Sequence, residues 1–409
     1  MAAGVAAAAC SVVLNERDLL RIAVFAVLLP VLSALLAARA RIGLTAERKV
    51  VPHRVPVGAG TEVRIEIAKA GRLPGGGLLL EDGVSYLLGS RPRFVVDRLS
   101  RRRVTSLRYQ VRPTMRGVQQ VGPLTARVTD PFGMAEFDRQ LLGNDTLVVV
   151  PRVTSLVGTP AGSGADTGAT GSARLRSGQG TDDAVVRPYR HGDELRKVHW
   201  RSTAHRDELM VRIEERPRSG GTTVLLDHRA SAHRGAGPTS SLEWAVSFAA
   251  SVCLHLRRNG RQVRLSTVDE TVLVDATRSG GLTDVAVLDS LAALKPTAQR
   301  GLALRPDPAV EPDVVAVFGA TSSAEAAELS RLRSRTAHGL AVLLDVSAWG
   351  AAGRGAVADD TTAAKQVLRG CGWSVAVARP DTPPALVWGQ LCQASGSPDR
   401  DLPWIGEVR

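Results

Sequence analysis

Residues 222–260 read TTVLLDHRASAHRGAGPTSSLEWAVSFAASVCLHLRRNG, and this stretch decides the fold of the C-terminal half of the chain. The continuous apolar run 222–226 ends in Asp227, which is the pattern of a strand buried on both faces. An amphipathic helix is predicted over 242–258, because large apolar side chains recur there at four-residue steps. Ser240 and Glu243 predict a capping box at its start, and Asn259-Gly260 predicts its end. A buried strand followed by such a helix indicates an α/β domain.

The same strand and helix alternation continues to the C-terminus. Strands are predicted over 262–268, 314–318, 340–346 and 374–378, and helices over 282–294, 324–334, 362–369 and 384–394. This alternation predicts a mostly parallel, doubly wound sheet with helices on both faces. Ligands of such sheets bind at the carboxyl ends of the strands, so Asp227 and the loop after Phe318 are expected at the functional edge.

Upstream of this domain, residues 43–157 show the two-residue periodicity of strands. Strands are predicted over 63–67, 78–80, 94–96, 107–111, 124–128 and 146–150, with Gly- and Pro-containing turns between them. Several short strands at this spacing indicate a small antiparallel β-sandwich. The Gly-, Ser-, Ala- and Thr-rich residues 158–181 then predict a flexible linker, which leaves 182–409 for the α/β domain.

The N-terminal residues 1–42 are interpreted as a membrane anchor made of one full and one short apolar helix. Residues 22–38 carry no charge and would reach roughly 26 Å as a helix, near the lower limit for a span. Arg39, Arg41, Arg48 and Lys49 follow, and by the positive-inside rule they place the soluble domains on the cytoplasmic side of the cell membrane. The alternative is a cleaved signal peptide, but the chain does not open with a charged region.

Basic residues exceed acidic ones by 52 to 40, which gives a formal net charge of +12. This excess suits an anionic lipid surface or an acidic partner protein. Nucleic acid is not expected, because no zinc-finger spacing or aromatic stacking motif accompanies the arginines.

The charged stretch 189–211 reads YRHGDELRKVHWRSTAHRDELMV and holds several fixed residues. Its pattern resembles the signature of the domain-of-unknown-function 58 family, which is linked with von Willebrand factor A-like domains. The residues of the signature are Tyr189, Gly192, Asp193, Arg196, His199, Trp200, Arg201 and Ala204. The resemblance extends over essentially the whole chain and implies a link to MoxR-type AAA+ ATPases, and also to transglutaminase-like membrane proteins.

The resemblance also implies a place for a divalent cation, at an Asp-x-Ser-x-Ser motif after the first strand of the domain. Asp227 and Ser231 match this motif, but Arg229 replaces its first serine. A guanidinium at this position would repel a cation and could pair with Asp227 instead. A bound cation is therefore disfavoured, and no other cofactor is predicted.

Three functions remain open from the residues. The favoured hypothesis is a membrane-anchored, non-enzymatic adaptor or assembly factor, in which the signature is a structural clasp or a partner-binding surface. The first alternative is a metal-dependent ligand-binding or adhesion module. The second is a hydrolase that uses the His and Asp residues of the signature, although no motif of a known reaction class accompanies them.

Overall fold

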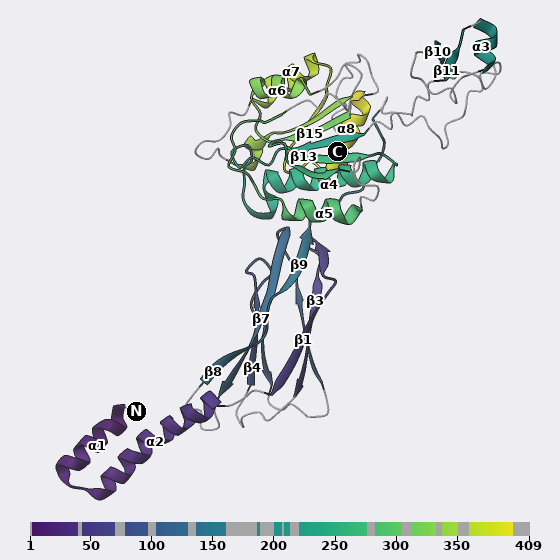
Figure 1. Ribbon diagram of the computed structural model, residues 1–409. Coiled ribbons are helices and arrows are strands. Elements are labelled where there is room, and N and C mark those ends of the chain that lie inside the picture. Colours follow the sequence, from purple (N-terminus) through teal and green to yellow (C-terminus); the bar gives the residue numbers. More distant parts are fainter. Residues whose placement is uncertain are drawn as a thin grey trace, which may run out of the picture.

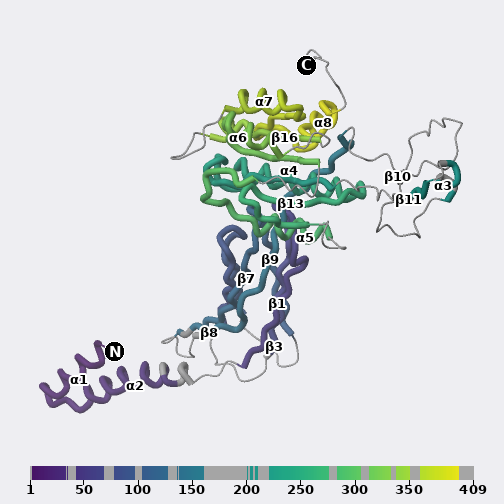
Figure 2. Tube along the Cα trace, turned by 45° about the horizontal axis from the view of Figure 1, so that its top comes forward, coloured from purple at the N-terminus to yellow at the C-terminus, as the bar shows by residue number. Residues whose placement is uncertain are grey.

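The computed structural model (Figure 1) describes residues 2–39, 43–69, 78–96, 104–129, 136–160, 186–188, 200–206, 208–212, 221–275, 283–304, 313–332, 338–350 and 360–395. A helical hairpin, a β-sandwich and an α/β domain follow one another along the chain. Figure 2 shows the sandwich standing between the hairpin and the α/β domain. The predicted linker falls almost wholly within 161–185, which lies outside the described residues.

The α/β domain is built on a six-stranded sheet with the order β14-β13-β12-β15-β16-β17. Its strands are β12 (Thr222–Leu226), β13 (Val263–Thr267), β14 (Val272–Asp275), β15 (Asp313–Phe318), β16 (Gly339–Leu344) and β17 (Ser374–Ala378). All neighbouring pairs are parallel except β13 with β14, which is antiparallel. The chain starts in the middle at β12 and winds outward both ways, so the topological switch point lies between β12 and β15.

Helices cover both faces of this sheet. The apolar face shared by strand residues such as Val224, Val315 and Val342 packs against α4 (Ser241–Arg258), α5 (Asp284–Ala293) and α8 (Pro384–Ser395). The opposite face packs against α6 (Ser323–Ser330) and α7 (Thr361–Gly370). The strands are therefore buried on both sides, which is why they read as continuous apolar runs.

The capping box predicted at the start of α4 is only half formed. The Ser240 side chain accepts a hydrogen bond from the Glu243 backbone N–H at 3.4 Å. The Glu243 carboxylate turns away from the cap and pairs with Arg116 of the sandwich. A complete capping box occurs instead at α6, between Ser322 and Glu325.

The sandwich consists of two packed sheets. One is β1 (Leu44–Val51), β3 (Thr61–Lys69) and β6 (Thr105–Val111), all antiparallel. The other has the order β2-β9-β7-β4-β5, with β8 also on β7. Its strands are β2 (Arg54–Pro56), β4 (Leu78–Val84), β5 (Arg93–Val96), β7 (Gly117–Thr129), β8 (Glu136–Leu142) and β9 (Asp145–Val150). Only β2 departs from the antiparallel prediction, because it runs parallel to β9.

Arg48 is one of the basic residues expected to set the membrane orientation of the chain, but it is a core residue of the sandwich. Its side chain is fully buried and pairs with Asp82, which is also fully buried, and with Asp145. Tyr109 donates a 2.6 Å hydrogen bond to the Asp82 carboxylate. Arg48 therefore neutralises carboxylates inside the sandwich.

The prediction of a membrane-spanning hairpin is wrong. Helices α1 (Ala2–Leu14) and α2 (Arg17–Arg39) do form a hairpin, but α1 has 13 residues, well short of the roughly 20 that a span requires. Helix α2 has 23 residues, but its first two turns contain Arg17, Asp18 and Arg21, which leaves an apolar stretch that is too short. Across the residues that the structure describes, no helix has the length and apolar character needed to cross a membrane.

A short strap joins the sandwich to the α/β domain after β9. Leu156 is buried in the core of the α/β domain, and the Thr154 N–H donates to Ser251 Oγ of α4 at 2.9 Å. The Gly158 carbonyl accepts hydrogen bonds from Trp388 Nε1 at 3.0 Å and from His255 Nε2 at 2.7 Å. Residues 153–158 therefore pack on the α/β domain, although the sequence pattern places most of them with the sandwich.

Candidate functional site

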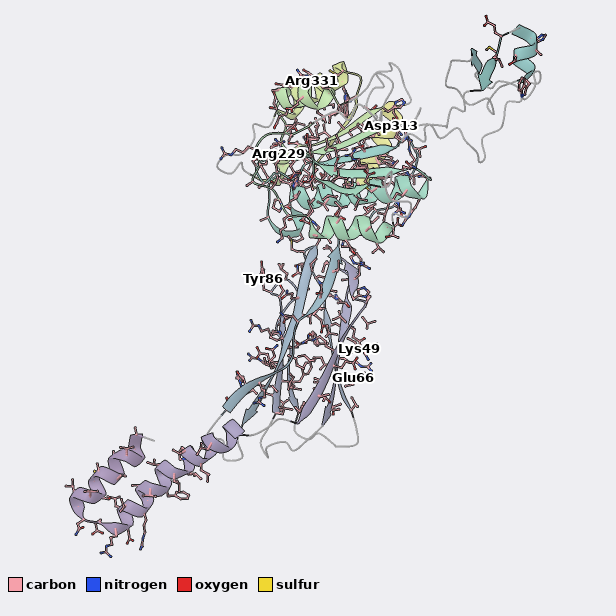
Figure 3. The ribbon with its side chains drawn as sticks, in the orientation of Figure 1. Lys49, Glu66, Tyr86, Arg229, Asp313 and Arg331 are labelled. Atoms are coloured by element: carbon pink, nitrogen blue, oxygen red, sulfur yellow. The ribbon has the colours of Figure 1, made fainter. Side chains whose placement is uncertain are left out.

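The candidate site is the carboxyl edge of the central strand β12. The chain turns there through Asp227, His228 and Arg229, which are 0, 5 and 0% exposed. Figure 3 shows Arg229 and Asp313 at opposite ends of the α/β sheet, because Arg229 follows β12 whereas Asp313 begins β15. Gly319 lets the loop after β15 approach closely, since a Cβ there would lie 2.2 Å from the Ala232 carbonyl oxygen.

Arg229 and Asp227 form a buried two-point ion pair. Arg229 Nε donates to Asp227 Oδ1 at 3.0 Å, and Nη2 donates to Oδ2 at 2.9 Å. The backbone N–H of Arg229 also donates to Asp227 Oδ1 at 3.0 Å. The pairing expected from the sequence is therefore confirmed, and both oxygens of the Asp227 carboxylate are engaged.

Glu325 and a backbone carbonyl complete the surroundings of the guanidinium. Arg229 Nη1 pairs with Glu325 Oε1 and donates to the Arg300 carbonyl at 2.9 Å. Glu325 is held in place because its other oxygen accepts from the Ser322 N–H at 2.9 Å, as part of the capping box. Burial alone would lower the pKa of Arg229, but its hydrogen bonds to Asp227 and Glu325 raise the pKa, so the guanidinium stays charged.

Two histidines lie next to this ion pair. His233 Nε2 is 2.9 Å from the Asp227 carbonyl oxygen, and its Nδ1 is 3.0 Å from Ser241 Oγ. A carbonyl oxygen only accepts hydrogen bonds, so Nε2 of His233 carries the proton. The imidazole is therefore neutral, and its Nδ1 accepts a hydrogen bond from the Ser241 hydroxyl. His228 Nε2 lies 3.6 Å from Asp269 Oδ2, and its buried Nδ1 has no hydrogen-bond partner among the described residues. Burial lowers the pKa of both histidines.

The residues around Asp227 do not fit the divalent cation that the resemblance implies. A hard cation needs several free oxygen ligands, whereas the Asp227 carboxylate is occupied by Arg229. Ser231 Oγ is buried without a hydrogen-bond partner in the described part of the chain, but Thr321 Oγ1 is used in a 3.0 Å bond to the Gly319 carbonyl. Where the structure describes the chain, no group of three or more His, Cys, Asp or Glu residues could hold a metal ion.

Most of the signature lies outside the described residues, namely Tyr189, Gly192, Asp193, Arg196 and His199. Trp200, Arg201 and Ala204 lie on α3 (Trp200–Arg206), which is close in sequence to the paired strands β10 (Val186–Pro188) and β11 (Met210–Arg212). The Met210 N–H donates to Thr203 Oγ1 at 3.0 Å and so ties β11 to α3. Ala204 is exposed and Trp200 is 69% exposed, so the indole leaves a large apolar surface uncovered within the described structure.

An interdomain cleft of about 750 Å³ opens between the sandwich and the α/β domain. Its walls are residues 115–119 of the sandwich, parts of the loop and helix start 230–243, and residues 292–296 after α5. Arg116 spans the contact: it pairs with Glu243 and donates to the carbonyls of Leu291 at 3.0 Å and Leu294 at 2.9 Å. The sequence marks Arg116 only as part of a turn, and nothing local indicates its distant partners.

The fold and the site define a protein with a β-sandwich and a doubly wound α/β domain. The Asp227 carboxylate at the central strand of that domain is paired with Arg229. Residues 185–310, less than half of the chain, match the family described as "Protein of unknown function DUF58". The "Uncharacterized protein YeaD" of Bacillus subtilis is 25% identical over 167 residues, 41% of this chain and 40% of the relative. Both findings support the DUF58 family, and the chain matches less than half the length of this curated relative.

Solved structures show only weak similarity to parts of the chain. A cohesin module of a family 33 glycoside hydrolase from Clostridium perfringens is 15% identical, with a TM-score of 0.21, over 27% of this chain and 98% of its own. A CARDB domain from Pyrococcus furiosus is 19% identical, with a TM-score of 0.19, over 26% of this chain and 84% of its own. A conjugative transposon lipoprotein from Bacteroides eggerthii is 15% identical, with a TM-score of 0.18, over 26% of this chain and 98% of its own.

Proposed function

We propose that this chain is a non-enzymatic adaptor whose von Willebrand factor A-like α/β domain binds a MoxR-type AAA+ ATPase. A transglutaminase-like membrane protein is a second proposed partner. The observation that supports an adaptor best is the buried pair of Arg229 with Asp227. This pair occupies the Asp227 carboxylate, at the sheet edge where an α/β domain would otherwise bind its ligand. Binding to a partner protein is then expected to use other surfaces of the chain.

The exposed indole of Trp200 supports the same proposal. Tryptophan is enriched among the residues that dominate binding energy at protein interfaces, and here it belongs to the family signature. Its 69% exposure makes it available to a partner.

The test is capture of a purified MoxR-type ATPase by the immobilised full-length protein in the presence of ATP or ADP. We expect capture in at least one nucleotide state and a clear loss of capture in Trp200→Ala. Leu386→Ala is the matched control, because Leu386 is also a large apolar residue, 54% exposed, but lies on α8. No association in either nucleotide state would refute the proposal.

A metal-dependent binding module makes an opposing prediction. A bound cation would raise the melting temperature when Mg²⁺ or Mn²⁺ is added, and Asp227→Ala would remove this shift. Because Arg229 occupies the Asp227 carboxylate, we expect no shift in the unmodified protein. A shift that Asp227→Ala abolishes would favour the metal-dependent module over the adaptor.

A further inference from the structure

We propose that the interdomain cleft binds an extended acidic peptide segment of a partner protein, which pairs with a free edge of β7. This inference rests on the proposed adaptor function and names the kind of segment that the adaptor recognises. It is supported by the size of the cleft, by an edge of β7 that has no neighbouring strand among the described residues, and by the excess of positive charge around the cleft.

The cleft has the size and the backbone exposure of a peptide site. Its volume of about 750 Å³ lies within the range of known ligand pockets, which also occur preferentially between domains. Three consecutive residues of β7, Gly117, Val118 and Gln119, line it. Side chains alternate between the faces of a strand, so three consecutive lining residues mean that the backbone edge itself borders the cleft.

This edge of β7 lacks a neighbouring strand among the described residues. On its other edge, β7 pairs with β9 from Gly117 to Val121. Strand β4 pairs with β7 only from Val121 onward, and β8 only from Leu124 onward. The residues 117–120 therefore present roughly 13 Å of edge, at about 3.3 Å per residue, to which an extended peptide can add as a strand.

The charges around the cleft favour an acidic peptide. Arg116 is neutralised by Glu243, but Arg234 and Lys295 have no acidic partner within the described structure. The Nε atom of Arg234 is buried and has no hydrogen-bond partner there. Carboxylates of a bound peptide would supply opposite charges to these two cations.

Apolar residues that line the cleft favour a peptide that also carries apolar side chains. Val118 is 56% exposed on β7, and Leu242 and Leu294 line the facing wall. A peptide that alternates acidic and apolar residues would direct its carboxylates to one face and its apolar side chains to the other.

The experiment measures the fluorescence anisotropy of a labelled hexapeptide, Glu-Val-Glu-Val-Glu-Val, titrated with the full-length protein. The same peptide with lysine in place of glutamate tests the charge, and a version with methylated backbone amides tests strand pairing. Unlabelled glutarate tests whether a small dicarboxylate competes as well as the peptide does. The protein variants are Lys295→Glu and Arg234→Glu, with Arg331→Glu as control, because Arg331 lies at α6 on the side away from the sandwich (Figure 3).

We expect binding of the acidic peptide only, weakened about tenfold or more by each cleft variant and unchanged by Arg331→Glu, as for a close charge pair. Backbone methylation should abolish binding, and glutarate should compete poorly. Binding that survives both cleft substitutions, or that methylation leaves intact, would overturn the proposal, as would the absence of binding. If the cleft variants lose the peptide but the ATPase is never captured, the adaptor proposal fails and the peptide site stands.

Discussion

The buried carboxylate of Asp227 depends on the single residue Arg229 for its counter-charge. Replacing Arg229 with Met would leave Asp227 charged, fully buried and without its counter-ion. Removal of one partner from such a pair costs about 3–5 kcal/mol, and we expect a loss of this size in the free energy of unfolding, measured with urea. Arg127→Met is the control, because the exposed pair of Arg127 with Asp138 contributes at most about 1 kcal/mol.

The double variant Asp227→Asn with Arg229→Met separates the two causes of lost stability, which are the unpaired charge and the altered packing. It removes the uncompensated charge, so its stability should exceed that of Arg229→Met alone. If Arg229→Met costs no more than the Arg127 control, Arg229 does not neutralise the site.

The buried ring of His233 is expected to make the free energy of unfolding depend on pH. Burial lowers its pKa in the folded state below the ordinary value of 6.5, and it does the same for His228. The unfolded chain therefore binds more protons below about pH 6.5, so stability is full above this pH and is lost as the pH falls towards the folded-state pKa. We expect a lower free energy of unfolding at pH 5.5 than at pH 7.5.

The variant His233→Gln keeps a hydrogen-bond donor but cannot titrate, so it should reduce the difference between the two pH values. His205→Gln serves as the control, because His205 is an exposed residue of α3. An equal difference in all three proteins would assign the acid sensitivity to other groups.

At the scale of elements, two arginines of the sandwich hold it to the α/β domain. The more buried of the two is expected to contribute more to the free energy of unfolding. The Arg116 side chain is 4% exposed and contacts α4 and the end of α5, whereas Arg54 is 29% exposed and pairs with Asp289 at 2.6 Å. Arg116→Ala should lower the free energy of unfolding by roughly 3 kcal/mol, because Glu243 loses its buried partner. Arg54→Ala should cost about 1 kcal/mol or less. Equal losses in urea denaturation would contradict this ranking.

The elements themselves could be predicted from the sequence wherever periodicity was strong. The continuous run of β12 and the four-residue steps of α4 indicated both elements correctly. The edge strand β14 was missed because it has 4 residues and follows β13 through a tight turn. In α2, the uncharged run 22–38 suggested a membrane span, but it is shorter than the roughly 20 apolar residues that a span requires.

Side-chain partners could be predicted only when they are neighbours in the chain. Arg229 and Asp227 are two residues apart, so their pairing followed from the motif. Glu325 is 96 positions from Arg229, and Glu243 is 127 positions from Arg116, so no local pattern indicated either pair. Arg48 was likewise counted among the charges that set the membrane orientation, because its partner Asp82 is 34 positions away and belongs to a different sheet.

At the scale of the whole molecule, three sets of polar contacts join the sandwich to the α/β domain, and we expect them to make the two unfold as one unit. They are the pair of Arg54 with α5, the insertion of Arg116 between α4 and α5, and the strap that ends at Gly158. We predict that the triple variant Arg54→Ala, Arg116→Ala and Trp388→Phe uncouples the domains. Phenylalanine removes the indole N–H that bonds the Gly158 carbonyl, but it keeps an aromatic ring in the core.

Calorimetry and small-angle X-ray scattering test this prediction together. Because the interface would then contribute little to either domain, the unfolding of the triple variant should separate into two transitions, and its radius of gyration should rise. Arg127→Ala is the control, since its ion pair lies wholly within the sandwich, and it should keep the single transition. A triple variant with one transition and an unchanged radius of gyration would mean that the remaining contacts fix the domain arrangement, among them buried Leu156 and the strap's hydrogen bonds to Ser251 and His255. The interdomain cleft would then persist in the variant.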